Sequence, residues 1–225
     1  MKATAPPNTP NTTNRLQAIL FINLMTFGAT FTNISFKIAN ANGVTAIDYQ
    51  IFRGAFICLF IIPFLCAYGK HPVRDVPDGR FPIVVARSLF ATLNFIFYMW
   101  AMTLLPMYLA VILNNLSPFW ASILGTLVNG DKFYAIEFVA IAICFSCVVG
   151  ITFTQPAGDA EALTGKTYDS FWLGVVVSIV KSVLCALLGV TSRRAKDIHF
   201  SVLMTYNGLL GFSVPMLCMA VYYWT

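Results

Sequence analysis

The stretch PIVVARSLFATLNFIFYMWAMTLLPMYLAVILNNLSPFWASILGTLVN, residues 82–129, decides the fold class. It contains two apolar windows, 82–104 and 107–129, and Arg87 is its single charged residue. A hydrocarbon layer roughly 30 Å thick is crossed by a helix of about 20 apolar residues. The stretch therefore predicts two membrane-spanning helices joined by a short turn.

The same pattern continues on both sides of this stretch. Of all residues, 58% are hydrophobic and 10% are charged, whereas a soluble domain carries about 25% charged residues. The mean hydropathy is +0.76. We therefore expect an all-α integral membrane protein with about seven transmembrane helices. The further apolar windows are 16–38, 46–68, 133–154, 171–192 and 200–223.

The positions of Lys and Arg predict the orientation, because cytoplasmic loops of membrane proteins keep the positive charge. Most of these residues share one side of the membrane if residues 1–15 form a disordered cytoplasmic tail. They are divided among loops rather than gathered on one face, so the lipid bilayer is the expected partner and nucleic acid is not. The residues on the predicted cytoplasmic side are Lys2, Arg15, Lys70, Arg74, Arg80, Lys132, Arg193, Arg194 and Lys196.

The chain contains a weak internal repeat with a displacement of 154 residues. This displacement places Phe171 on Gln17 and the triplet 206–208 (Tyr-Asn-Gly) on the triplet 52–54 (Phe-Arg-Gly). A first unit of five helices would turn the second unit upside down in the membrane. We expect one complete repeat at 16–155, an outer loop at 156–170, and the first two helices of an inverted second repeat at 171–225. The chain would then be a fragment of a ten-helix protein, or its second unit would be degenerate; in a homodimer, a second copy could complete it.

One segment, ARSLFATLNFIFYMWAMTLLPMYLAVILNNLSPFWASILGTLVNGDKF at 86–133, is followed by FVAIAICFSCVVGITFTQP at 138–156. Together they resemble the EamA unit of the drug/metabolite transporter superfamily. The resemblance implies ten helices in two inverted repeats and transport of a small organic metabolite by alternating access. The residues that carry it are Arg53, Gly54, Arg87, Tyr98, Ala101, Leu105, Pro106, Ala110, Ser117 and Pro118.

Polar side chains inside the predicted spans are candidates for a solute path, because such groups are costly in hydrocarbon and normally face the bundle interior. In the first span they recur every three or four residues, which aligns them on one helical face. The alternative role is hydrogen bonding between helices for the polar residues of the first span, and helix packing for those of the fourth. The candidate path residues are Asn33, Arg87, Asn94, Tyr98, Asn114, Asn115 and Lys181.

The charged residues within the spans leave several pairings open. Lys181 lies near the expected midplane and could bind an anionic or zwitterionic solute, pair with Asp48 or Glu137, or be neutral. Arg87 could extend its side chain back to the membrane surface, pair with Glu137, or bind an anionic solute. Arg53 is expected to be held by Asp48 in a structural ion pair.

Other functions have less support in the sequence. An enzyme is not expected, because no span carries a nucleophile with a base or a set of metal ligands, and the two histidines, His71 and His199, fall in predicted loops. No catalytic residue, cofactor or metal is therefore assigned. Cys144 and Cys147 form a C-x-x-C within an apolar run, where packing is the better interpretation. A non-transporting scaffold or degenerate carrier remains the main alternative, ahead of a seven-helix receptor, whose N-terminus would lie outside.

Overall fold

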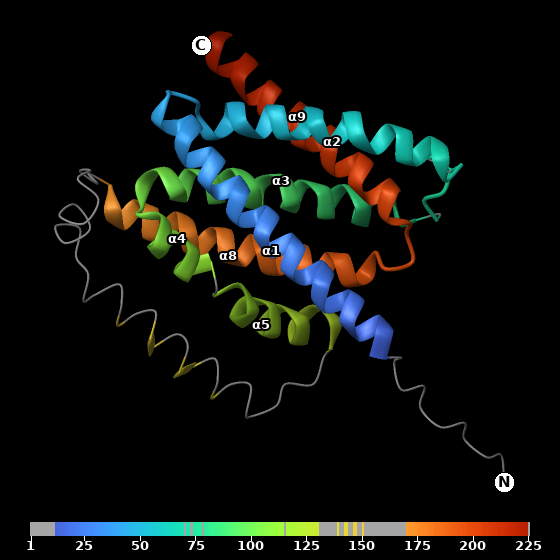
Figure 1. The fold of residues 1–225 in the computed structure, drawn as a ribbon, viewed down its shortest axis with the longest axis horizontal. Helices are drawn as coiled ribbons and strands as arrows, with labels where there is room; N and C mark the ends of the chain where they lie inside the picture. Colours follow the sequence, from blue (N-terminus) through green and yellow to red (C-terminus); the bar gives the residue numbers. More distant parts are fainter. Residues whose placement is uncertain are drawn as a thin grey trace. The chain divides into compact units, whose positions relative to one another are not determined.

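The computed structural model describes residues 12–130 and 170–224, except for positions 70, 73, 78 and 115. It also describes scattered residues between 139 and 150. Within these residues every regular element is a helix and there is no strand (Figure 1). The helices are α1 (Thr12–Ala41), α2 (Ala46–Ala67), α3 (Phe81–Leu104), α4 (Met107–Asn114), α5 (Ser117–Asn129), α8 (Phe171–Arg194) and α9 (Phe200–Trp224).

In the described part of the chain, six helical stretches are long and apolar enough to cross a membrane. They coincide with six of the seven windows expected from hydropathy, with α4 and α5 together filling the fourth. The prediction of an all-helical, multi-pass membrane protein is therefore confirmed. Of the fifth predicted span, 133–154, the structure describes only scattered residues between 139 and 150, and Glu137 is not among them.

The chain consists of two compact units, residues 1–43, which contain α1, and residues 44–225, which contain the other helices. Within α1, side chains of the predicted polar stripe bond to the helix's own backbone. Asn23 Nδ2 donates to the carbonyl of Ile19 at 2.9 Å, and Thr30 Oγ1 donates to that of Thr26 at 3.0 Å. These two polar groups are thus satisfied locally.

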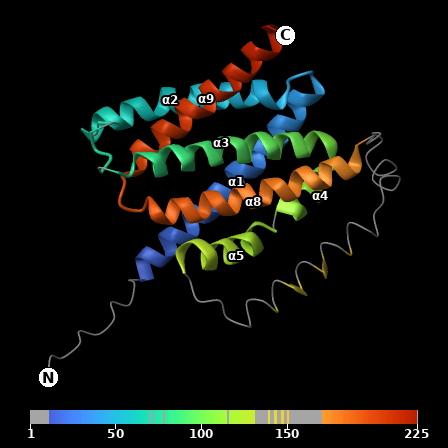
Figure 2. The ribbon, with the colours of Figure 1, turned by 180° about the vertical axis from the view of Figure 1, so that it is seen from behind.

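In the second unit, α2 packs mainly against α9, and α3 packs mainly against α8. Helix α3 also contacts α9, and α8 also contacts α4 and α5. Figures 1 and 2 show from opposite sides that α2 and α3 run in opposite directions, as do α8 and α9. This alternation is what successive membrane-spanning helices require.

Local sequence explains where several helices begin and end. Thr45 caps α2 in a capping box, since its hydroxyl accepts from the N–H of Asp48 at 3.2 Å and the Asp48 carboxylate accepts from the N–H of Thr45 at 3.1 Å. Helix α3 ends at Leu104, and the extended backbone of the next residue, Leu105, suits a position before proline. Gly130, with φ of 72°, supplies the left-handed residue that closes α5.

The fourth predicted span is divided rather than kinked. Helix α4 ends at Asn114, and α5 begins at Ser117 with Pro118 in its first turn. Proline is tolerated there because the first N–H groups of a helix have no partner within the helix. The fourth span is therefore interrupted between Asn114 and Ser117.

Glycines allow α2 and α9 to cross with their backbones in contact. A Cβ on Gly54 would lie 2.6 Å from the carbonyl carbon of Gly211, and one on Gly208 would lie 2.8 Å from Cys58 Sγ and 2.9 Å from Ile57 Cγ2. Small residues permit such close approach between membrane helices. The α2–α9 crossing therefore depends on glycine at these positions.

Several contacts between side chain and backbone join the helix ends at one end of this unit. Arg80 Nη1 donates to the carbonyl of Arg194 at 2.6 Å, and Arg80 Nη2 lies 3.6 Å from the Asp197 carboxylate. Arg194 in turn donates to the carbonyl of Val128. These contacts connect the start of α3, the end of α5 and the end of α8. The basic residues Arg80, before α3, and Arg194, at the end of α8, thus lie at the same end of the helices.

Candidate functional site

Helices α3 and α8 pair in one continuous antiparallel register. Arg87 Nε donates to Ser192 Oγ at 3.0 Å, and the Lys181 Nζ lies 4.5 Å from the centre of the Tyr98 ring. At the far end, a Cβ on Gly174 would lie 2.7 Å from Leu105 Cγ. Each step forward on α3 is matched by an equal step backward on α8 in these three pairs, so the antiparallel register is constant along the interface. We call it the α3–α8 seam.

Lys181 is the most deeply buried charged group of the seam. The Lys181 side chain belongs to a residue that is 4% exposed, near the middle of α8. The ammonium group lies over the Tyr98 ring, whose negative face attracts a cation. Among the residues that the structure describes, no carboxylate contacts it. Lys181 and Tyr98, both predicted for the solute path, are thus brought together.

Other polar atoms of the seam are buried and lack a hydrogen-bond partner among the described residues. Asn94 Oδ1 is one of them, and it belongs to the side chain that the register places across from Cys185. Ser178 Oγ is another, one helical turn before Lys181. A buried polar group without a partner costs about 1–3 kcal/mol. Such groups are therefore unusual, and here they are close in sequence to the buried lysine.

Arg87 lies at the end of the α3–α8 seam opposite to that of Gly174, beyond Lys181. One of its three nitrogen groups bonds to Ser192, while Nη1 is buried without a described partner. The pairing with Glu137 falls outside the described residues. Its bond to Ser192 thus holds Arg87 against α8.

Asp48 and Arg53 do not form the ion pair that the sequence suggested. The Asp48 carboxylate accepts from the N–H of Thr45 at 3.1 Å and from its hydroxyl at 2.7 Å. The guanidinium carbon of Arg53 lies 4.1 Å from the centre of the Phe95 ring, and its Nη1 donates to Gln50 Oε1 at 3.4 Å. The reason is geometric, because residues five apart point in different directions from a helix of 3.6 residues per turn.

The remaining predicted path residues are not joined to the seam by any described contact. Asn114 ends α4, and its Oδ1 is buried without a described partner. Asn33 belongs to the first unit, and Asn115 lies outside the described residues.

Sequence reasoning missed Gln50, Ser88, Thr92 and Ser178, which are all almost completely buried. Each has a buried polar side-chain atom without a described hydrogen-bond partner. The available signal was spacing, since Gln50 precedes Arg53 by three residues and Ser178 precedes Lys181 by three. Residues at this spacing share a helical face.

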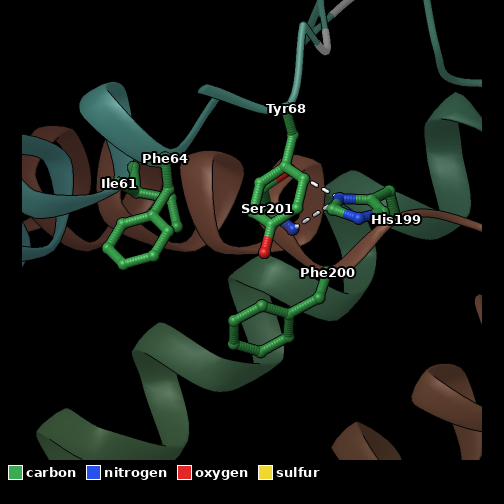
Figure 3. A pocket seen from close by; sticks show the side chains of 6 residues that line it. All are labelled: Ile61, Phe64, Tyr68, His199, Phe200 and Ser201. Atoms are coloured by element: carbon green, nitrogen blue, oxygen red, sulfur yellow. Dashed lines mark hydrogen bonds between the residues drawn. The ribbon is translucent and has the colours of Figure 1, made fainter. Parts of the chain in front are cut away.

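A groove of about 360 Å³ opens elsewhere, where α2 ends and α9 begins. In Figure 3 the rings of Tyr68 and His199 face each other across it, and Phe64 and Phe200 lie beside them. The ring centres of Tyr68 and His199 are 5.4 Å apart, and His199 Nδ1 lies 2.7 Å from Ser201 Oγ. None of its lining residues belongs to the seam, so we treat it as a separate surface feature.

Comparison with known proteins identifies the family. Residues 16–153 match the EamA-like transporter family, which covers more than half of the chain. Searches of curated proteins and of solved structures found no match. The matched residues include α1 to α5 and the whole α3 side of the seam. With six helices able to cross a bilayer, the chain is a multi-pass membrane protein that belongs to the EamA-like transporter family.

Proposed function

We propose that this protein carries a small, negatively charged organic solute across the bilayer by alternating access, and that the solute binds at Lys181 on the α3–α8 seam. The observation that carries this proposal is the burial of Lys181 beside Tyr98. A charge within the membrane normally has a partner or a function. An anionic solute would supply the partner.

The surroundings of Lys181 fit such a role. The aromatic face of Tyr98 stabilises the ammonium group without neutralising its charge. The surrounding helices are apolar, and attraction between charges is stronger in a low-dielectric interior than in water. The buried Oγ of Ser178 has no described hydrogen-bond partner, and as a hydroxyl it can donate to an anion. Anchoring by Lys181 and a hydrogen bond from Ser178 would together select an acidic solute.

The proposed alternating access uses two inverted repeats, and the α2–α9 crossing supports them. A displacement of 154 residues relates Gly54 to Gly208, and Ile57 and Cys58 to Gly211 and Phe212. A Cβ on Gly54 would meet Gly211 and Phe212, while one on Gly208 would meet Ile57 and Cys58. The contacts are thus exchanged between the two helices, as they are across any two-fold axis. Rocking of one repeat against the other about this crossing is the proposed motion.

The test is solute-driven charge movement in proteoliposomes, recorded on a solid-supported membrane. Purified protein is supplied in turn with glutarate, butyrate, glycine and choline, which cover organic anions, a zwitterion and a cation. We expect currents with an acidic solute in the wild type and none in Lys181→Met. Lys196→Met is the matched control, because Lys196 is an exposed lysine beyond the end of α8.

Two outcomes would overturn the proposal. Currents in Lys181→Met equal to those of the wild type, at equal amounts of reconstituted protein, would remove Lys181 from the site. Currents with choline alone would show that the solute is a cation, which a buried lysine repels.

A further inference from the structure

A second group of buried polar side chains lies where α2, α3 and α9 meet, away from Lys181. It consists of Gln50 and Arg53 on α2 and Thr92 on α3, beside Gly211 on α9. We infer that this group is a second oxyanion subsite, which binds the distal acidic group of a solute whose first acidic group is bound at Lys181. The inference rests on the proposed function and adds the solute class, an organic dianion with two separated acidic groups.

The subsite is rich in hydrogen-bond donors that lack acceptors. Gln50 and Thr92 are both 0% exposed, and neither Gln50 Nε2 nor Thr92 Oγ1 has a hydrogen-bond partner among the described residues. Among the described residues, the one acceptor bound to Arg53 is Gln50 Oε1 at 3.4 Å, while a guanidinium carries five N–H donors. A carboxylate or phosphate oxygen is the acceptor that such a set of donors would bind.

The two unpartnered groups face the same point on α9. A Cβ placed on Gly211 would lie 2.9 Å from Gln50 Nε2 and 3.8 Å from Thr92 Oγ1. Glycine leaves that position without a side chain, so both groups approach the α9 backbone from α2 and α3. The donors therefore converge although they come from different helices.

The two cations lie over neighbouring rings of α3. Arg53 of α2 lies over Phe95, and Lys181 of α8 lies over Tyr98. Phe95 and Tyr98 are three residues apart, so they are neighbours on the helix surface. Three residues correspond to a rise of about 4.5 Å along α3. A short solute lying across this face would have one cation from α2 near one end and one from α8 near the other.

The experiment compares glutarate with butyrate, which share a short carbon chain but carry two carboxylates and one. Affinities are measured on the purified full chain in lipid nanodiscs from the dependence of the melting temperature on ligand concentration. We expect the wild type to bind glutarate at least tenfold more tightly than butyrate. Arg53→Gln should bind glutarate only as tightly as butyrate, with unchanged affinity for butyrate. Arg74→Gln is the matched control, since Arg74 lies exposed in the loop between α2 and α3.

Gln50→Leu is the second variant in case Arg53→Gln does not fold, because it removes the buried donor and leaves both cations in place. It should reduce the preference for glutarate severalfold. An undiminished preference in either folded variant would overturn the subsite. Equal affinities in the wild type, with loss of both in Lys181→Met, would overturn the subsite and leave the proposed function intact. Binding of neither anion to the wild type would count against the proposed function itself.

Discussion

Gly54 of α2 and Gly211 of α9 stand so close that a methyl group on Gly54 would lie 2.6 Å from the Gly211 carbonyl carbon and 2.8 Å from its oxygen. The neighbouring atoms belong to the helix backbone, which cannot rotate aside as a side chain can. Gly54→Ala must therefore push the two helices apart. We expect the free energy of unfolding to fall by about 1–3 kcal/mol, the usual cost of overpacking.

Unfolding of the purified protein in mixed micelles with increasing SDS measures this loss. Gly189→Ala is the control, because Gly189 lies in α8 and a Cβ there would have no neighbour within 4 Å. Alanine is the better helix former, so this control should be neutral or slightly stabilising. Equal stability of Gly54→Ala and the wild type would show that the crossing is looser than described.

Capping, rather than ion pairing, should account for the contribution of Asp48 to stability. Its carboxylate bonds to Thr45, while Arg53 bonds to Gln50. We expect Asp48→Ala to cost about 0.5–2 kcal/mol of unfolding free energy, the usual range for a lost helix cap. The same cost should appear in an Arg53→Gln background. A coupling energy well above experimental error in this double-mutant cycle would restore the ion pair.

The aromatic face of Tyr98 should contribute to binding through the position of Lys181. Tyr98→Leu removes the ring beneath the ammonium group, whereas Tyr98→Phe keeps it. Because such contacts contribute about 0.5–2 kcal/mol, we expect Tyr98→Leu to weaken the binding of an acidic solute by roughly 2- to 30-fold. Titration of glutarate into nanodiscs measures the affinities. A Tyr98→Phe variant as weak as Tyr98→Leu would assign the effect to the hydroxyl group instead.

The bond between Arg87 and Ser192 should couple α3 to α8. At 3.0 Å it joins a charged donor to a hydroxyl, a type of bond that contributes about 1.5–3 kcal/mol. Arg87→Gln and Ser192→Ala should therefore each destabilise the protein, and the double variant should cost clearly less than the two separate losses together. Stability in SDS is again the measurement. Simple additivity would mean that the bond contributes nothing.

Orientation in the membrane can be tested with single cysteines in a background that lacks the native ones. Asp75 lies in the loop between α2 and α3, and Ser170 precedes α8; both are exposed. The positive-inside rule predicts that a membrane-impermeant maleimide labels Ser170→Cys in intact cells. Asp75→Cys should react only after permeabilisation. The reverse pattern would place the basic loops outside.

The membrane spans could be predicted from the sequence, since hydropathy is a property of neighbouring residues. The window 46–68 became α2 at Ala46–Ala67, and 171–192 became α8 at Phe171–Arg194. The division between α4 and α5 was not predicted as a break. Pro118 marked the disturbance, but whether a proline bends a helix or begins a new one depends on the packing around it.

Part of the candidate site could likewise be predicted from the sequence, and part could not. Arg87, Tyr98 and Lys181 could be selected because polar residues are conspicuous in apolar segments. Ser192, the partner of Arg87, and Phe95, the partner of Arg53, could not be selected, because serine and phenylalanine are ordinary residues in membrane helices. Gln50 and Thr92 became notable through their complete burial without a described hydrogen-bond partner.

The sequence by itself determined the all-helical membrane class, the limits of six spans and the family, because each depends on residues that are close along the chain. Only the tertiary structure decided that Arg53 lies over Phe95, that Arg87 bonds to Ser192, and that α2 meets α9 at glycines. The physical reason is that a membrane helix exposes several faces of similar polarity. Which face meets which neighbour is settled by the fit of helices that are distant in sequence.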